Sequence, residues 1–150
     1  MVSSHLMPTA PLAAELASIC RQFPIDALYV FGSRSEQIAG RLRGCDSKTP
    51  VSLSSDADIG VQTRVGERLS VAHRVKLAIR LEDLFGVARV DLVILEEAGA
   101  FLALDAIRGE LIYCADEYRQ AEFELFVLRR AADLAHFERL HRRDTLRRVR

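Results

Sequence analysis

The sequence contains ALYVFGS at residues 27–33 and SDADIGV at residues 55–61, and the architecture of the chain follows from these two stretches. The first is an apolar and aromatic run that stops at a glycine and a serine, as a buried strand followed by a turn would. The second places Asp56 and Asp58 at the start of another apolar run, which predicts a strand over 58–62. Because residues i and i+2 of a strand project to the same face, the two carboxylates are expected to lie side by side.

A third apolar run, residues 87–95, carries Asp91 near its centre and predicts a third strand of a mostly buried sheet. An unpaired carboxylate in an apolar strand costs several kcal/mol of desolvation, so a compensating partner is expected. One alternative is a structural role, in which Asp91 bonds a backbone N–H or pairs with Arg89. The other is metal ligation, because hard divalent cations prefer carboxylate and phosphate oxygens. Asp56 and Asp58 repel each other unless a cation lies between them, so the three aspartates together favour a metal site.

The pair Gly32-Ser33 follows the first strand and precedes a predicted helix. Glycine permits a turn that brings backbone N–H groups close to a triphosphate, and the hydroxyl of Ser33 can donate to the same oxygens. The alternative is an ordinary strand-to-helix turn with Ser33 as the N-cap. On these two residues alone, the ordinary turn is preferred.

Apolar residues at helical spacing predict helices over 12–23, from about Ser35, and over 65–85, 99–108 and 116–141. Pro24 ends the first helix, and Gly86 lies where a C-cap of the third belongs. A short strand is predicted over 110–113 and a long loop over 40–55. The apolar face predicted for the 65–85 helix consists of Leu69, Ala72, Val75 or Lys76, Ile79 and Leu84, and that of the last helix consists of Phe123, Phe126 or Val127, Ala131, Leu134 and Phe137.

The composition indicates one domain over residues 1–150, with a core at about 12–113 and a C-terminal helix at about 116–143. The chain has 21 Lys and Arg against 21 Asp and Glu, so no overall field draws it onto nucleic acid or an anionic membrane. Its cysteines, Cys20, Cys45 and Cys114, are scattered and are expected to be free thiols. No apolar run is long enough to span a membrane, and no leader pattern is seen, which predicts a soluble cytoplasmic protein.

Three segments together, FGS at 31–33, SDADIGV at 55–61 and RVDLV at 89–93, resemble the minimal nucleotidyltransferases (MNT proteins) of the polymerase-β-like superfamily. The resemblance runs from about Leu28 to Tyr113. It implies an α/β (α+β) palm-like domain, with a mixed sheet flanked by helices and a long C-terminal helix. It also implies that Gly32 and Ser33 hold the nucleotide phosphates, and that Asp56, Asp58 and Asp91 are catalytic and bind two magnesium ions.

The resemblance implies a specific activity as well. Many MNT proteins are antitoxins paired with a HEPN ribonuclease toxin, and they transfer AMP from ATP to a tyrosine of that toxin, which neutralises it. One departure is the segment 34–55, roughly twice as long as the corresponding family loop, although a surface insertion costs little closure entropy. Arg41, Arg43 and Lys48 in this segment are expected to be solvated charges rather than ligands of the triphosphate.

Other functions remain open from the sequence. One is a binding antitoxin of the same fold without catalysis, against which the intact aspartate triad argues. Another is nucleotidyl transfer to a small-molecule acceptor, but such enzymes usually carry an additional domain and this chain has little room for one. The spacing of Arg130 and His136 resembles the arginine–histidine pair of HEPN ribonucleases, which would make this chain the toxin, but that reading leaves the aspartates unexplained. His73, His136 and His141 are expected to be ordinary surface or core residues. The apolar stripe of the last helix leaves a core contact, a homodimer and a heteromeric complex equally open.

Overall fold

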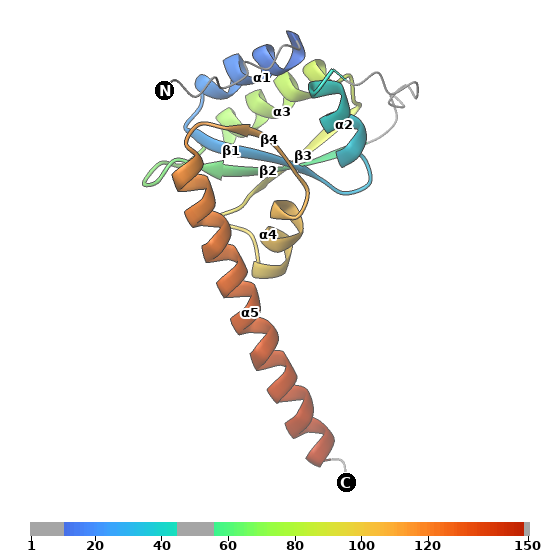
Figure 1. Cartoon of the computed structure of the whole chain (residues 1–150), viewed down its shortest axis with the longest axis vertical. Helices are drawn as coiled ribbons and strands as arrows, with labels where there is room; N and C mark the ends of the chain where they lie inside the picture. The colour runs from blue at the N-terminus through green and yellow to red at the C-terminus, as the bar shows by residue number, and fades with distance from the viewer. Residues whose placement is uncertain (1–10, 45–55, 149–150) are drawn as a thin grey trace, which may run out of the picture.

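Four strands form one mixed sheet in the order β3-β2-β1-β4 (Figure 1). Strand β1 pairs antiparallel with both β2 and β4, whereas β2 and β3 are parallel. The computed structural model of the chain describes residues 11–44 and 56–148. Along the chain the elements are α1 (Pro11–Arg21), β1 (Ile25–Phe31), α2 (Ser35–Leu42), β2 (Asp56–Thr63), α3 (Val71–Phe85), β3 (Arg89–Ile94), α4 (Ala100–Ile107), β4 (Glu110–Cys114) and α5 (Glu117–Arg148). The predicted mixed sheet flanked by helices is confirmed.

Helices α1, α2 and α3 cover one face of the sheet (Figure 1). Alternate residues of the strands, such as Leu28 and Val30 of β1 and Ile59 of β2, point into this layer and are fully buried. They pack against Leu16 of α1 and Ile38 of α2 in one continuous apolar cluster. Burying side chains of this size stabilises the fold by roughly 1.5 to 3 kcal/mol each, so this layer forms the main core.

The opposite face of the sheet is covered by α4 and the first half of α5 (Figure 1). Its apolar contacts are fewer and include Ala27 and Tyr29 of β1 with Ala106 of α4. Helix α4 lies close to β2 at Gly60, where a β-carbon would stand 3.1 Å from the β-carbon of Ala106. The even-numbered residues of β2, including Asp56 and Asp58, belong to this less covered face.

Helix α5 is fixed to the sheet by polar contacts as well as by packing. The buried Tyr29 hydroxyl donates to Glu124 at 3.0 Å and accepts from the Gln120 amide at 2.8 Å. Asp26, which is fully buried, accepts two hydrogen bonds from the Arg119 guanidinium, at 2.9 and 3.0 Å. These contacts satisfy polar groups of β1 that would otherwise be costly to bury.

The limits and the buried face predicted for the third helix are partly wrong. Helix α3 begins at Val71, because the Ser70 hydroxyl accepts a hydrogen bond from the His73 N–H and caps the helix there. Gly86 ends it in the left-handed conformation, as predicted. The buried residues are Leu77, Leu81 and Phe85, whereas Val75 and Ile79 of the predicted face are 55% and 52% exposed.

Helix α5 is longer than predicted and leaves the core partway along its length. Val127 and Ala131 are buried, but Leu134 and Phe137, at the end of the predicted apolar stripe, are 41% and 67% exposed. Figure 1 shows the C-terminal half of the helix projecting away from the sheet and from α4. The stripe therefore contacts the core only as far as Ala131.

The segment predicted as a long loop begins with helix. Helix α2 continues to Leu42, and Arg41 on it donates to the backbone oxygen of Phe85 at 2.9 Å. Arg43, at the C-cap, forms an exposed ion pair with Glu110 at 2.6 Å and so remains a solvated charge, whereas Arg41 is held by its hydrogen bond to Phe85. Lys48 and Cys45 lie outside the described residues. None of the described helices has the length and apolar character needed to cross a membrane.

Candidate functional site

Asp58 and Asp91 are neighbours across the parallel pair of strands β2 and β3. The pairing matches Asp56 with Arg89 and Asp58 with Asp91, and residues paired in this way project to the same face. On its other side Asp58 is paired with Phe31, the last residue of β1. Three strands therefore bring the aspartates and the turn after β1 to one end of the sheet, on the face that α4 and α5 cover only partly.

The carboxylates are close enough to act on one another electrostatically. Partial burial raises the pKa of Asp58, and the negative charges of Asp91 and Asp56 raise it further. A group whose pKa is raised by two like charges lies where a cation would be stabilised. Asp58 and Asp91 are therefore paired across the strands, and the charge of Asp56 also acts on Asp58.

Asp91 is neither unpaired nor deeply buried, which corrects the argument from the apolar strand. Strand β3 is an edge strand, and the Asp91 side chain is 41% exposed and pairs with Arg89 at 2.9 Å. Because an exposed ion pair contributes little to stability, this contact is easily exchanged for another. The structural alternative for Asp91, pairing with Arg89, is the arrangement found in this structure.

Gly32 lies directly beneath the Asp58 carboxylate. Its φ of +77° is in the left-handed region, and a β-carbon built on it would stand 2.6 Å from Asp58 Oδ2. Ser33 is exposed beside it. Helix α2 starts at Ser35 with Arg34 as the N-cap, so an N-cap role for Ser33 is wrong. Gly32 is therefore required both for its backbone conformation and for its lack of a side chain.

A second glycine holds α4 and β4 against the same end of the sheet. A β-carbon on Gly109 would overlap the backbone oxygen of Val30 and stand 2.8 Å from the β-carbon of Phe31. The turn between α4 and β4 thus packs onto the strand end that carries Gly32. Glu110, the next residue, is the partner of Arg43, so α2 is tied to the same place.

The aspartates do not form a ready-made metal site. Within residues 11–44 and 56–148, no three His, Cys, Asp or Glu side chains are gathered so that they could hold an ion. The three side chains themselves fit magnesium, because all are carboxylates. The pKa of Asp58 is raised in part by the negative charges of Asp91 and Asp56, and a bound cation would offset these charges. Asp91 Oδ1 is held by Arg89 at 2.9 Å, so this ion pair competes with a cation for the carboxylate.

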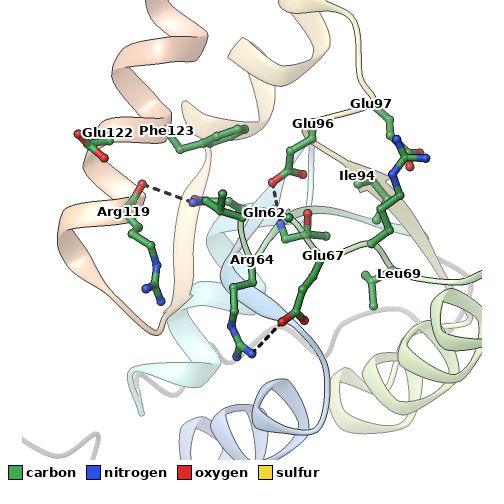
Figure 2. Close-up of a pocket in the computed structure, with 14 residues that line it drawn as sticks. Gln62, Arg64, Glu67, Leu69, Ile94, Glu96, Glu97, Arg119, Glu122 and Phe123 are labelled. Carbon is green, nitrogen blue, oxygen red and sulfur yellow. Dashed lines mark hydrogen bonds and ion pairs between the residues drawn. The ribbon is translucent and has the colours of Figure 1, made fainter.

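A cavity of about 740 Å³ lies at the other end of β2, away from the aspartates (Figure 2). It is lined by residues from the end of β2, the turn after it, the end of β3 and the start of α5. No local sequence pattern indicates this cavity, because its walls come together only through folding.

Residues 14–118 match the family model described as polymerase beta, nucleotidyltransferase. The match covers more than half of the chain and includes the whole sheet with Gly32 and the three aspartates. The chain therefore belongs to this nucleotidyltransferase family, as its resemblance to the MNT proteins implied. A comparison of the sequence with curated proteins finds no match.

Similar solved structures come from toxin–antitoxin complexes. A chain of a toxin–antitoxin structure with AMP-PNP aligns with a TM-score of 0.64 at 19% identity, over 89% of this chain and 98% of the other. A chain of the tri-AMPylated Shewanella oneidensis HEPN toxin in complex with an MNT antitoxin aligns with a TM-score of 0.56 at 20% identity, over 92% and 95%. A chain of the MntA–HepT toxin–antitoxin aligns with the same score and identity, over 92% and 96%. At these identities, the likeness shows the shared fold.

Proposed function

We propose that this protein is an antitoxin-type nucleotidyltransferase that transfers AMP from ATP to a tyrosine hydroxyl of a partner HEPN ribonuclease toxin, and so neutralises it. The observation that carries the proposal is the pairing of Asp58 with Asp91 across β2 and β3, with Gly32 directly beneath Asp58. This arrangement offers carboxylates for magnesium beside an open turn for a triphosphate. Membership of the nucleotidyltransferase family supports the reaction class.

The partner is proposed from the similar structures. Their descriptions name a HEPN toxin, an MNT antitoxin, AMP-PNP and an AMPylated toxin. This chain carries the nucleotidyltransferase family match, so in such a pair it corresponds to the MNT antitoxin rather than to the toxin. The weak resemblance of Arg130 and His136 to a HEPN pair loses further support, because Arg130 donates to the backbone oxygen of Ala98.

In the proposed reaction, the tyrosine oxygen attacks the α-phosphorus of ATP in line, the bond to the bridging oxygen breaks, and pyrophosphate leaves. Magnesium held by Asp56, Asp58 and Asp91 would offset the phosphate charge and make the attacking hydroxyl more acidic. Gly32 keeps the turn close to the phosphates, and Ser33 donates its hydroxyl to them. Asp91, on the edge strand and 41% exposed, is assigned the role of accepting the hydroxyl proton.

The test is a transfer assay with the partner protein. The chain is incubated with magnesium, α-labelled ATP and the HEPN-like protein encoded beside it, and both chains are then analysed by mass spectrometry. AMP on a tyrosine of the partner, absent with the Asp56→Asn, Asp58→Asn double variant, is the expected result. Label on neither chain with any of the four nucleoside triphosphates would overturn the proposed activity.

One observation favours a second function, that of a binding antitoxin without catalysis. The Arg89–Asp91 pair occupies the carboxylate that would complete a metal site. If this ion pair persists when magnesium and ATP are present, Asp91 does not bind the metal and transfer does not occur. The protein could then neutralise the toxin only by binding to its surface. Neutralisation of the toxin's ribonuclease activity by the Asp56→Asn, Asp58→Asn variant as well as by the wild type would establish this second function.

A further inference from the structure

The cavity at the far end of β2 has a buried polar wall. Gln62, on the same face of β2 as Asp58 and four residues further along, lines it and is only 3% exposed. At the rise of an extended strand, the two residues are roughly 13 Å apart, so the cavity is separate from the candidate catalytic site. In Figure 2 the Gln62 side chain lies between the start of α5, with Arg119 and Phe123, and the turn after β3, with Glu96.

Gln62 has an acceptor that nothing in the described part of the chain satisfies. Its amide nitrogen donates to the backbone oxygen of Arg119 at 3.4 Å, whereas its Oε1 is buried without a hydrogen-bond partner. Turning the amide over would only place Oε1 against the Arg119 carbonyl, which is also an acceptor. A buried acceptor left in this way is costly, so the cavity is suited to a group that brings an N–H or O–H donor.

Glu96 adds a negative charge to the same wall. Its Oε1 accepts the Thr63 N–H at 2.8 Å, one residue from Gln62, so this carboxylate oxygen faces the cavity although the residue as a whole is exposed. Burial, and then the charge of Asp26, raises the pKa of Glu96. Among the described residues no cation lies within ion-pair distance of Glu96. Of the three arginines that line the cavity, Arg119 is hydrogen-bonded to Asp26, Arg64 pairs with Glu67 at 3.6 Å, and Arg68 makes no ion pair with Glu96.

The rest of the wall is suited to an aliphatic chain. Leu69 and Ile94 are buried apolar residues of this cavity, and the ring of Phe123 closes it from the side of α5 (Figure 2). A ligand that places methylene groups against these three residues and a donor against Gln62 would satisfy both kinds of surface. The carboxylate of Glu96 then selects a positively charged donor over a neutral one.

We propose that this cavity binds an ammonium or guanidinium group on a short aliphatic chain, carried by a free small molecule or by a basic side chain of another polypeptide. The cation pairs with Glu96, and one of its N–H groups donates to Gln62 Oε1. Such charge-assisted hydrogen bonds are stronger than neutral ones, so the charge of the ligand matters as much as its shape. This site is independent of the proposed nucleotidyl transfer.

The experiment is a titration of the ¹⁵N-labelled chain followed by NMR. The probes are butylguanidinium, butylammonium and the neutral analogue butylurea. Saturable shifts of the Gln62 side-chain amide and the Thr63 backbone amide are expected with both cations, and binding of butylurea is expected to be at least about tenfold weaker. The absence of saturable shifts with any probe, or equal affinity for butylurea and butylguanidinium, would overturn the proposal.

Variants separate the two contacts. Glu96→Gln keeps the shape of the side chain. It should weaken the binding of both cations about tenfold and leave the binding of butylurea unchanged. Gln62→Met replaces the side chain by one of similar size that lacks the amide acceptor, and it should weaken the binding of all three probes. Glu138→Gln, on the exposed part of α5, changes the net charge equally and should have no effect. Unchanged affinities in Gln62→Met and Glu96→Gln, with native spectra, would also overturn the proposal.

Two further probes distinguish the sources of the cation. The capped tripeptide acetyl-Gly-Arg-Gly-amide presents the guanidinium as a partner protein would, whereas agmatine presents it on a free small molecule. Tighter binding of the tripeptide than of agmatine assigns the site to a basic side chain of another polypeptide. The reverse order assigns it to a free cation.

Discussion

The Asp58 carboxylate lies over Gly32 so closely that a β-carbon on this glycine would stand 2.6 Å from Asp58 Oδ2. The contact joins the turn after β1 to the start of β2. It places the proposed phosphate-binding turn and a proposed metal ligand within van der Waals distance. The position of Asp58 therefore depends on a residue that carries no chemistry of its own.

Replacing Gly32 with alanine should abolish divalent-cation binding while lowering the stability of the fold only slightly. Alanine is strained at a φ of +77°, which should lower the free energy of unfolding by about 1 kcal/mol, and its methyl group must also displace the Asp58 carboxylate. Gly66→Ala is the matched control, because Gly66 has a φ of +79° and nothing within 4 Å of its β-carbon position. Denaturation should give similar losses for both variants, and only Gly32→Ala should lose divalent-cation binding. Equal cation binding by the two would contradict the role given to Gly32.

Removing a carboxylate of the site should abolish transfer without destabilising the chain. Asp58→Asn removes a partly buried charge that Asp91 and Asp56 repel, so in EDTA the melting temperature should stay equal or rise slightly. Loss of this proposed metal ligand should lower the proposed transfer rate at least about 100-fold. Magnesium should raise the melting temperature of the wild type but not of this variant.

The control for this charge removal is Asp83→Asn, an exposed aspartate of α3 on the other side of the sheet. It should keep both transfer and the response to magnesium. A large loss of folding stability in Asp58→Asn, measured in EDTA, would instead indicate that Asp58 is a structural residue.

The sequence was sufficient for the strands and for the face that the aspartates share. Alternation along a strand is local, so Asp56 and Asp58 were placed correctly from their spacing alone. The family resemblance implied that Asp91 acts together with Asp56 and Asp58, but the pairing of Asp58 with Asp91 depends on β2 and β3 being parallel neighbours, which no local pattern indicates. The Arg89–Asp91 pair was considered only as an alternative, because the apolar neighbours of Asp91 suggested burial rather than an edge strand.

Periodicity could not select the buried face of α3. The helix carries two apolar rows at the same spacing, Val71, Val75 and Ile79 on one side and Leu77, Leu81 and Phe85 on the other. The leucines and Phe85 face the core, and the β-branched residues face solvent. Likewise Asp26 with Arg119, and the cavity at Gln62, join residues far apart in the sequence, so no local pattern reveals them.

Breaking the pair between Asp26 and Arg119 should destabilise the fold. Arg119→Met leaves the fully buried Asp26 carboxylate without its two hydrogen bonds, and water can compensate only in part. The free energy of unfolding should fall by about 2 kcal/mol, measured by urea denaturation. Arg43→Met breaks the exposed pair with Glu110 and should cost less than about 1 kcal/mol. Adding Asp26→Asn to Arg119→Met should recover part of the loss, and a further loss instead would contradict this account.

The projecting part of α5 should serve the partner rather than the fold. Phe137 and Leu146 are 67% and 71% exposed on a helix segment without buried residues, and exposed apolar side chains in such numbers mark interaction surfaces. Deleting residues 136–150 should shift the melting temperature by less than about 3 °C, yet weaken binding of the HEPN partner at least about tenfold. Phe137→Ala should weaken binding more than Tyr118→Ala, which removes an equally exposed ring at the other end of the helix. Unchanged partner affinity after the deletion would place the interface elsewhere.

The ion pair between Arg89 and Asp91 should compete with the metal. Arg89 holds the carboxylate at 2.9 Å and lies across from Asp56, so its charge opposes a cation at both residues. Arg89→Gln should therefore tighten the binding of Mn²⁺ by about threefold at low ionic strength, measured by electron paramagnetic resonance of the free ion. Arg129→Gln, on the exposed surface of α5, removes the same charge far from the site and should leave the affinity unchanged.

The outcome for Arg89 separates the two functions considered for this chain. Tighter Mn²⁺ binding in Arg89→Gln, reversed by adding Asp91→Asn, would mean that Asp91 is a metal ligand once the arginine releases it. Unchanged or weaker binding would mean that Asp91 stays a partner of Arg89 in a structural pair. In that case the two remaining aspartates lack the third carboxylate that the proposed transfer needs, and the non-catalytic antitoxin becomes the better account of the fold.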